Sequence, residues 1–386
     1  MMPRFLFVTN GHGEQAIAGR IADELHRLGQ FEIDHLSLVG DHLRAGGILR
    51  PVGPARTLPS GGLVAMGNVR NLMRDLRGGL LSHSLAQLRF LGSVKQHYDV
   101  AVAVGDIFAY VMARRAAASR TAFVGTAKSV HVARYGPFEV RLLRSADAIF
   151  VRDEPTARDL QARGIEASAP GNVIVDLFEE ASGDDALALA GKQIAIFPGS
   201  RASAYADAVF ACAIVRALAV KMPAIEAAIS IAPGLVPQRF AQVLREDGWD
   251  VAPVDVPSTP FVLRLRERPL ITAWSGSLGA MLKDAVVVLG QAGTANEAAA
   301  ARGIPIAAFE RTAASATSWY RERQRGLLNG ALTLLRGSAD SSADQLANLI
   351  ADGERRQKMA AIGRERMGSA GGARAIALRL EAMARC

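Results

Sequence analysis

One pattern recurs along most of this sequence: a short apolar run ends in a glycine-bearing turn, and a stretch with helical periodicity follows. Clear examples of the apolar run begin at Phe5, Val100 and Ile194. Short apolar runs that alternate with helical segments are typical of parallel β-sheets covered by helices. The pattern therefore predicts an α/β fold.

The apolar runs form two series. In the first, strands are expected over residues 4–9, 31–39, 100–104, 122–124 and 148–151, with a helix over about 14–28 that Gly29 stops. In the second, strands are expected over 193–197, 227–231, 270–272, 286–289 and 304–309. Helices are expected to fill the intervals, and the tail from about 343 is expected to be helical with a break at 368–372.

The length of 386 residues indicates two domains, at roughly 150 residues per domain. A polar, glycine-bearing stretch near 183–192 places the junction around 175–190. We expect a first domain over 1–175 and a second that begins near 190.

The composition narrows the class of protein. The two cysteines, Cys212 and Cys386, cannot form a disulfide framework or a zinc site, which is typical of a reduced, intracellular protein. The initial apolar run is too short for a signal peptide, and no stretch of about 18 apolar residues occurs. We expect a cytoplasmic protein that is soluble or peripheral at the inner face of the membrane.

Basic residues outnumber acidic ones by 45 to 37, a net charge of +8, and only six of them are lysine. Arginine suits forked contacts to phosphate or carboxylate. A phosphorylated substrate, an anionic membrane or nucleic acid would fit this balance. Nucleic acid is the weakest of the three, because no basic run carries interleaved aromatic residues.

Two polar groups follow strands of the first series. The turn after residue 9 contains Asn10, Gly11, His12, Gly13 and Glu14. It is either a ligand-binding turn, with His12 as a base near neutral pH, or an ordinary tight turn. Asp106 follows the run 100–104 and is either a general base or the cap of a helix that begins at Ile107.

Two turns of the second series carry donors for an anion. Gly199, Ser200 and Arg201 follow the strand at 193–197, where backbone, hydroxyl and guanidinium donors suit a diphosphate. The segment 290–297 opens a helix whose first amides would bind phosphate, with Glu297 placed to accept hydrogen bonds from ribose. The alternative is a capping box between Thr294 and Glu297.

The segment 61–92 interleaves ten Leu and Met residues with Arg70, Arg74, Arg77 and Arg89. It could form a basic amphipathic surface that contacts anionic lipid. It could equally be a core helix with a solvated arginine face, which is the more frequent outcome.

Taken together, the chain resembles GT-B glycosyltransferases, and within them the lipid-A-disaccharide synthase-related proteins. The segments that carry the resemblance are 9–14, 197–201, 290–297, 319–324 and 366–373, so it covers nearly the whole chain. It implies two Rossmann-like domains facing a central cleft, over 1–175 and 190–365. It also implies that the C-terminal helix, 366–386, crosses back to the first domain.

The resemblance also implies roles for particular residues. Arg201 with Gly293 and Thr294 would meet the diphosphate of a nucleotide sugar, usually UDP-linked. Glu297 would meet the ribose, and Gln324 would point toward the donor sugar. His12 or Asp106 would take the proton of an acceptor hydroxyl, in a direct displacement with inversion. No metal and no cofactor are implied, because arginine and helix dipole stabilise the leaving diphosphate and the nucleotide sugar is a substrate.

The match is poorest on the acceptor side. The lipid-A enzymes carry Gly-Glu-Ala-Ser-Gly-Asp after the first strand, where this chain has Gly11-His12-Gly13-Glu14-Gln15. Only Gly105-Asp106-Ile107-Phe108 stands where they carry Gly-x-Asp-x-Pro-Asp. The expected function is glycosyl transfer to a lipid or lipid-linked acceptor. The alternatives are a sugar-nucleotide epimerase of the same fold and a non-catalytic nucleotide-sugar-binding protein. A dehydrogenase lacks support, since the Gly-x-Gly-x-x-Gly motif is missing.

Overall fold

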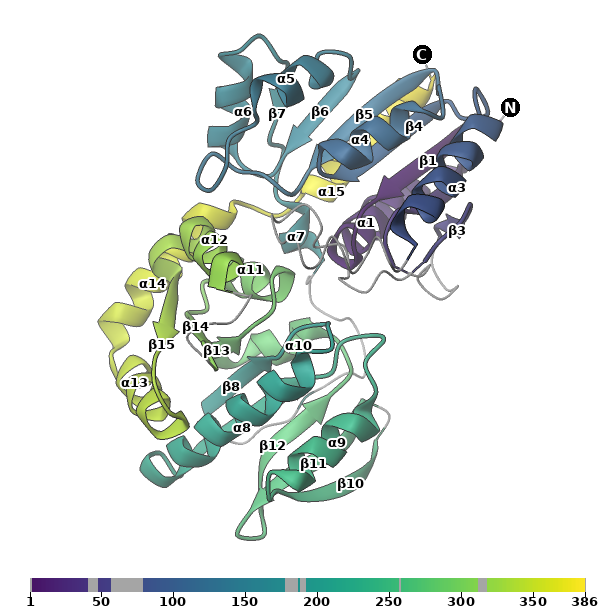
Figure 1. Ribbon diagram of the computed structural model, residues 1–386. Coiled ribbons are helices and arrows are strands. Elements are labelled where there is room, and N and C mark those ends of the chain that lie inside the picture. The colour runs from purple at the N-terminus through teal and green to yellow at the C-terminus, as the bar shows by residue number, and fades with distance from the viewer. Residues whose placement is uncertain are drawn as a thin grey trace. The chain divides into compact units, whose positions relative to one another are not determined.

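The computed structural model describes residues 2–40, 48–56, 79–177, 187, 192–256, 258–311 and 318–385. The chain divides into two compact units (Figure 1). Unit 1 comprises residues 1–177 and 369–386, and unit 2 comprises residues 178–368. The observed division falls at the start of the expected junction, and the tail belongs to unit 1 from Ser369 onward.

Unit 1 is built on a seven-stranded sheet in the order β3-β2-β1-β4-β5-β6-β7. The paired strands all run parallel. Their bounds are β1 Arg4–Thr9, β2 Glu32–Ser37, β3 Arg50–Pro51, β4 Val100–Gly105, β5 Arg120–Gly125, β6 Ala148–Val151 and β7 Ala167–Ser168. The β1 residues Phe5, Leu6, Phe7 and Val8 are completely buried, as expected for a strand covered by helices on both faces.

Helices cover both faces of this sheet. They are α1 His12–Leu28, α3 Leu80–Ser93, α4 Ile107–Arg114, α5 Pro137–Leu143, α6 Glu154–Gln161, α7 Val173–Asp176 and α15 Gly372–Arg385. The apolar residues of α1 recur at helical spacing, and Ile17, Ile21 and Leu25 are buried. Helices α1, α7 and α15 pack together, and α15 is the yellow helix beside the strands in Figure 1.

The C-terminal tail is held to unit 1 by specific contacts. The Asp176 carboxylate accepts hydrogen bonds from the Gly371 amide at 2.6 Å and the Ala373 amide at 2.7 Å, so it caps α15 from outside the helix. A Cβ on Gly372 would lie 2.3 Å from the Gly171 carbonyl oxygen. Only glycine permits this approach, which explains the glycine-rich break between α14 and α15.

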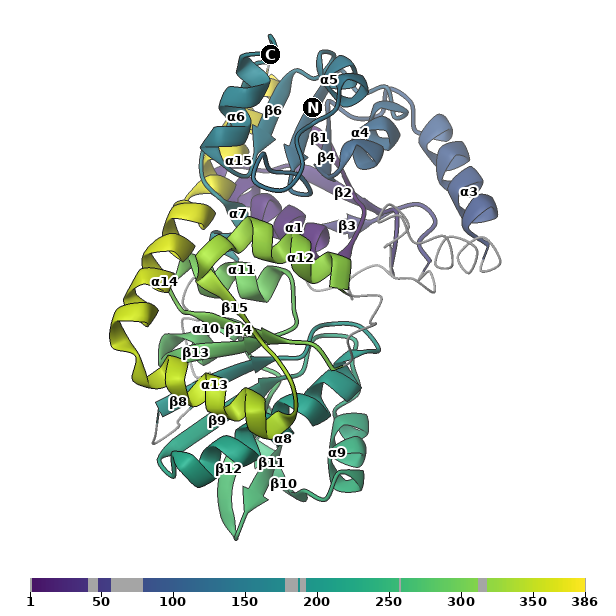
Figure 2. The same ribbon diagram turned by 60° about the vertical axis from the view of Figure 1, so that its left-hand side comes forward.

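Unit 2 has an eight-stranded sheet in the order β10-β11-β12-β9-β8-β13-β14-β15 (Figure 2). The strands are β8 Lys192–Phe197, β9 Ile225–Ser230, β10 Asp250–Val256, β11 Thr259–Leu265, β12 Arg268–Trp274, β13 Ala285–Gly290, β14 Ile306–Phe309 and β15 Leu332–Leu335. The helices are α8 Ala204–Lys221, α9 Pro237–Glu246, α10 Leu278–Lys283, α11 Thr294–Ala301, α12 Ser318–Leu328, α13 Ala339–Ala351 and α14 Gly353–Met367.

One expectation about unit 2 is wrong. The intervals that contain β10, β11 and β15 were expected to be helical, but they are strands, and β10 and β11 extend the sheet in antiparallel pairing. Arg266 and Glu267 make the two-residue turn between β11 and β12, with φ of 50° and 66°. Positive φ at both turn residues matches a type I′ hairpin turn, which usually carries Asn-Gly or Asp-Gly. The sequence signal for this hairpin is therefore missing.

Candidate functional site

The carboxyl ends of the parallel strands carry the polar residues singled out from the sequence, as in other open α/β sheets. In unit 2 the first turn follows β8. Gly199 has a φ of +107°, and no heavy atom lies within 4 Å of the position a Cβ would take. Ser200 and Arg201 are exposed, and the Arg201 carbonyl accepts a hydrogen bond from the Ala204 amide at 2.8 Å. The turn thus presents an open backbone beside a solvent-facing guanidinium.

The second turn joins β13 to α11. The helix begins at Thr294 and its N-cap is Gly293, so no cap side chain covers its first amides. The capping box considered from the sequence is not formed, because Thr294 is already the first helical residue rather than the cap. Uncapped amides at a helix N-terminus are donors for an anion, and the helix dipole adds to their attraction.

Hydrogen bonds join these two turns to the end of β14. The Gln291 amide donates to the Phe197 carbonyl at 2.8 Å, and its side-chain Nε2 donates to the Phe309 carbonyl at 2.7 Å. The turn before α11 therefore lies between the ends of β8 and β14, as the strand order requires.

Gln324 fixes the shape of this turn. Its Nε2 donates to the Ala292 carbonyl at 2.9 Å and the Gly293 carbonyl at 3.4 Å, and its Oε1 accepts from Asn296 Nδ2 at 3.3 Å. Both amide side chains are buried. The approach of Gln324 to a donor sugar and of Glu297 to a ribose stay predictions.

Sequence reasoning missed Arg311, which follows β14. Its Nε donates to Asp207 Oδ1 at 2.7 Å, and Asp207 lies in the first turn of α8. The available signal was an arginine directly after an apolar strand, the same signal that identified Arg201.

In unit 1 the corresponding position after β4 is occupied by Asp106. Its Oδ1 accepts from the Phe108 amide at 2.9 Å and the Ala109 amide at 3.1 Å, so the helix-cap interpretation is confirmed. Burial raises the pKa of this carboxyl, the two amides oppose that rise, and the charge of Glu139 adds to it. A carboxyl with a raised pKa is better suited to proton transfer near neutral pH. The role as general base stays a prediction.

Asn10 positions Asp106. Its side chain hydrogen-bonds the Asp106 carboxylate, and its Oδ1 lies against Gly105, where a Cβ would be 2.2 Å away. Gly105 has a φ of +136°, so glycine is required there both for conformation and for space.

The start of α1 differs from the expectation by two residues. The helix begins at His12 rather than at about 14, and Gly11 is its N-cap. Gly13 follows inside the helix. The Glu14 carboxylate lies over the helix start, because a Cβ on Gly11 would be 2.5 Å from Glu14 Oε2. The His12 side chain is outside the described part of the structure, so its role as a base stays a prediction.

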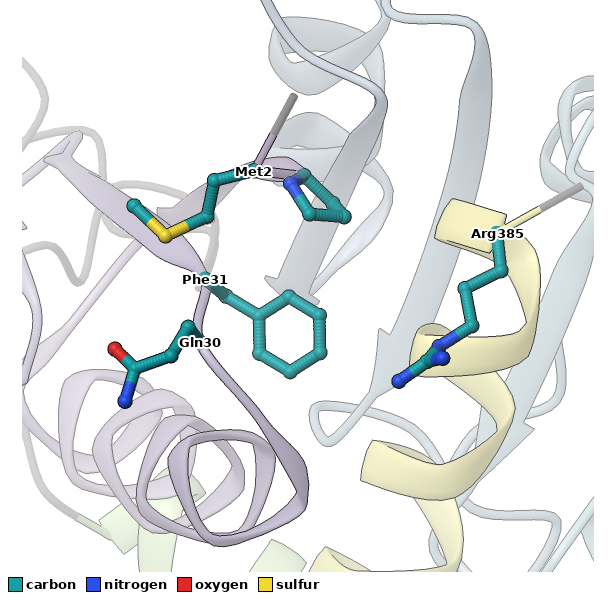
Figure 3. Close-up of a pocket in the computed structure, with 5 residues that line it drawn as sticks. Met2, Gln30, Phe31 and Arg385 are labelled. Atoms are coloured by element: carbon teal, nitrogen blue, oxygen red, sulfur yellow. The ribbon is translucent and has the colours of Figure 1, made fainter.

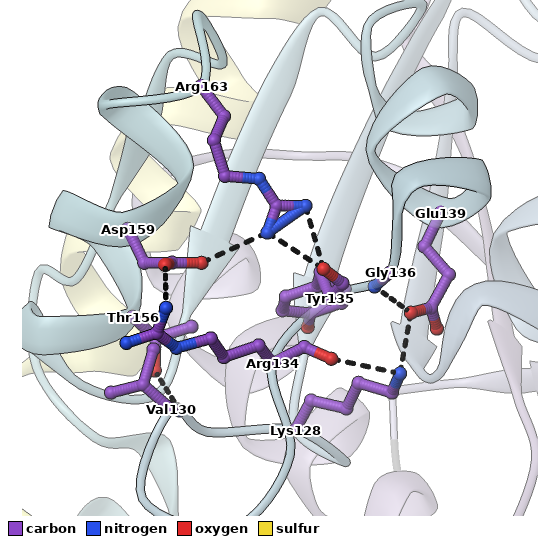
Figure 4. Close-up of polar contacts among 9 residues, drawn as sticks. All are labelled: Lys128, Val130, Arg134, Tyr135, Gly136, Glu139, Thr156, Asp159 and Arg163. Carbon is purple, nitrogen blue, oxygen red and sulfur yellow. Dashed lines mark hydrogen bonds and ion pairs between the residues drawn. The ribbon is translucent and has the colours of Figure 1, made fainter.

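Sequence reasoning also missed a polar network that follows β5 (Figure 4). Glu139 Oε2 accepts from the Gly136 amide at 2.6 Å and from Lys128 Nζ at 2.5 Å. The Tyr135 side chain is buried, and its hydroxyl has no hydrogen-bond partner within the described residues. Burial raises the pKa of this phenol, and the charge of Glu139 raises it further. Glu139 thus acts on both Asp106 and Tyr135.

The segment 61–92 is described only from residue 79, so Arg70, Arg74 and Arg77 lie outside the described residues. Within α3 the outward face carries Leu81 and Leu85, which are 66% and 53% exposed. The inward face carries His83 and Gln87, and Gln87 Nε2 donates to the carbonyls of Ser37 and Leu38 at 3.1 and 3.2 Å. The same helix also packs on the core, because Leu91 is completely buried and Leu88 and Phe90 pack against the core, while Arg89 is exposed. The described part of the segment therefore combines a core-facing side with two exposed leucines, and its contact with lipid stays a prediction.

Three further findings concern parts of the described structure away from these turns. A hollow of about 460 Å³ lies at the opposite edge of unit 1, where Met2, Gln30, Phe31 and Arg385 line it (Figure 3). Arg385 is the one charged residue among those that line this hollow. No group of three or more His, Cys, Asp or Glu side chains that could hold a metal occurs in the described ranges. Among the helices that the structure describes, none is long and apolar enough to cross a membrane.

Known proteins resemble this chain in structure but not in sequence. No protein-family profile matches it, and no curated protein matches it. The UDP-GlcNAc 2-epimerase from Neisseria meningitidis, solved with UDP-GlcNAc, superposes with a TM-score of 0.57 at 14% identity, over 98% of this chain and 100% of that one.

Glycosyltransferases superpose equally well. The calicheamicin glycosyltransferase CalG4 gives a TM-score of 0.61 at 18% identity, over 99% of this chain and 98% of that one. The kitacinnamycin glycosyltransferase gives 0.62 at 16% identity, over 99% of both chains. These similarities do not show the lipid-A-disaccharide synthase family. They show that the chain has the two-domain α/β GT-B fold, with a largely parallel sheet in each domain.

Proposed function

We propose that this protein is a nucleotide-sugar enzyme, and specifically a glycosyltransferase that uses a UDP-linked donor. The observation that carries the proposal is the pair of turns in unit 2. An exposed Arg201 follows β8, an uncapped helix start follows the adjacent β13, and Gln291 joins the two strand ends. A guanidinium beside free helix amides is the donor set that a diphosphate needs.

The donor would bind as follows. Arg201 and the amides at Gly293 and Thr294 meet the diphosphate, while Gly199 and Ser200 allow close approach to the backbone. Glu297, one turn into α11, accepts hydrogen bonds from the ribose hydroxyls. Gln324 acts on the donor site through the turn that it shapes, because its buried side-chain amide is bonded to the Ala292 and Gly293 carbonyls.

The acceptor would bind to unit 1. Asp106 or His12 takes the proton of the acceptor hydroxyl as its oxygen attacks the anomeric carbon. The bond from that carbon to the diphosphate breaks, so the configuration inverts. Arg201 and the α11 dipole stabilise the negative charge that develops on the leaving diphosphate, and the proposed reaction uses no metal.

We propose a lipid or lipid-linked acceptor, with peripheral contact to an anionic membrane. This is supported by α3, where Leu81 and Leu85 face outward although polar residues of the same helix are buried. Outward leucines on a helix next to a basic segment suit an apolar ligand or a lipid surface.

Epimerisation of a UDP-sugar is the second candidate. Asp106 and Glu139 are both in unit 1, and the charge of Glu139 raises the pKa of Asp106. Two carboxyl groups with different environments suit an acid and base that act on one sugar. The Neisseria epimerase superposes nearly as well as the two glycosyltransferases, with a TM-score of 0.57 against 0.61 and 0.62.

Two measurements test these proposals. Calorimetry with UDP tests the donor site: Arg201→Ala and Glu297→Ala should each weaken binding about tenfold or more, because a hydrogen bond to a charged group is worth roughly 1.5–3 kcal/mol. Wild-type affinity in both variants would remove the site.

Mass spectrometry of products, after incubation with a UDP-sugar panel, tests the reaction. Sugar transfer that requires a lipid extract supports the transferase. A changed sugar nucleotide without any acceptor supports the epimerase. UDP binding without turnover supports a non-catalytic binding protein, and a lack of UDP binding overturns all three.

A further inference from the structure

The β14 end brings a second guanidinium to the turn that precedes α11. Gln291, within that turn, is hydrogen-bonded to the last residue of β14, Phe309, and Arg311 follows two residues later. On the other side the same Gln291 is bonded to Phe197, four residues before Arg201. Arg201 therefore follows β8 and Arg311 follows β14, and these two strands flank β13 on either side.

The two arginines differ in how they are held. No acidic side chain pairs with Arg201 among the residues that the structure describes. Arg311 is anchored through Nε to Asp207, whose side chain is 8% exposed, whereas the Arg311 side chain is 41% exposed. The Asp207 carboxylate thus accepts a hydrogen bond from the Nε–H of Arg311. The N–H groups on the two Nη atoms are not used by this ion pair and can donate to an anion.

This arrangement orients a cation in advance. A buried carboxylate such as that of Asp207 is costly without a cationic partner. The ion pair with Asp207 therefore holds the Arg311 guanidinium in one orientation. A donor that is already oriented loses less conformational freedom on binding an anion than a solvated side chain does. The anchor lies in the first turn of α8, the helix that follows the Arg201 turn.

We propose that Arg311 is a second diphosphate-binding arginine and that Asp207 is the residue that positions it. Arg201 and Arg311 would then clamp a diphosphate from both sides of the α11 N-terminus. This inference rests on the proposed nucleotide-sugar site and deepens it: two cations on opposite sides of the turn match a diphosphate better than a single phosphate.

Calorimetry with UDP, UMP and uridine tests this. Arg311→Gln should weaken UDP binding about tenfold or more, weaken UMP binding less, and leave uridine binding unchanged. Asp207→Asn should weaken UDP binding several-fold in the wild-type background. It should add little in the Arg311→Gln background, because a positioning residue acts only through the residue it positions.

A matched control is available on the same helix. Arg216 makes an ion pair with Asp247 at 2.9 Å, and it lies nine positions after Asp207 along α8. Arg216→Gln removes the same charge and the same kind of pair, and it should leave UDP affinity unchanged. Thermal melting of each variant reports whether the fold is intact.

The outcomes separate this inference from the proposed function. If Arg201→Gln weakens UDP binding and Arg311→Gln does not, the clamp is wrong while the nucleotide site stands. If Asp207→Asn lowers affinity equally in both backgrounds, its positioning role is wrong. If the wild-type protein binds no UDP, the proposed function and the clamp both fail.

Discussion

Two helices of this protein begin at equivalent places, directly after a buried parallel strand, but their first turns differ in what they can bind. Helix α4 follows β4 in unit 1, and α11 follows β13 in unit 2, each at the carboxyl end of a buried parallel strand. Asp106 caps α4 with its own carboxylate, whereas Gly293 leaves the first amides of α11 without a side-chain cap.

The comparison shows that the N-cap residue of the following helix determines which ligands the end of a strand can bind. The carboxylate on α4 satisfies the helix amides and repels an anion, so that place offers a proton acceptor. The glycine on α11 leaves the amides and the dipole to a ligand, so that place offers an anion site. The surroundings of Asp106 carry further negative charge, because the charge of Glu139 raises the pKa of Asp106.

The largest expected effect tests the role of Asp106 as a proton acceptor. Asp106→Asn should lower kcat by about 10²–10⁴-fold, the usual contribution of a general base. Asparagine caps a helix about as well as aspartate, so the melting temperature should change little. Single-turnover product formation gives the rate. Retention of activity would move the base role to His12.

A carboxylate placed on α11 should make the second helix resemble the first. Gly293 has a φ of −80°, a value that residues other than glycine readily adopt, so the backbone permits Gly293→Asp. The new side chain would cap the amides and repel phosphate, so UDP affinity should fall by about a hundredfold, as for the loss of two charge-assisted hydrogen bonds. Gly293→Ala is the matched control and should bind UDP far better. Equal affinity in the two variants would contradict an anion site at this helix start.

The sequence predicts this comparison only in part. Apolar runs located the ends of β4, β8 and β13, because a buried parallel strand reads as a continuous apolar stretch. Local spacing also indicated the Asp106 cap, whose partners are two and three residues away.

Contacts between distant residues could not be predicted in this way. Arg311 and Asp207 are 104 positions apart, and only the strand order brings them together. Lys128 and Glu139 are closer in sequence, yet the loop between them has no periodicity that predicts how it folds back. The β11–β12 hairpin was missed because Arg266 and Glu267 adopt positive φ without the usual turn residues.

A smaller effect is expected on the acceptor side of unit 1. Leu81→Gln with Leu85→Gln should reduce co-sedimentation with anionic vesicles and change stability by less than about 0.5 kcal/mol, because both leucines are exposed. Leu91→Ala, on the same helix but fully buried, should destabilise the protein by about 2–5 kcal/mol. A double variant that pellets like the wild type would remove α3 from the proposed lipid contact and favour a soluble acceptor.

The smallest expected effect concerns the pH dependence that the α4 cap imposes. Burial raises the pKa of Asp106 above its ordinary value of about 3.9, so the folded state binds this proton more tightly than the unfolded state does. The stabilising contribution is full below the ordinary value and is lost as pH rises through the raised one. The Asp106→Asn variant has no titratable carboxyl group at this position, so its stability lacks this dependence on pH.

The difference in unfolding free energy between the wild type and Asp106→Asn isolates this single group, since all other titrations are common to both. The wild type should lose stability relative to Asp106→Asn as pH increases from about 4. Urea unfolding of the two proteins across that range measures it. A wild type that gains relative stability with pH would mean that the amides of α4 outweigh burial. Asp106 would then be an ordinary cap with a depressed pKa, and the contrast with Gly293 would concern anion binding alone.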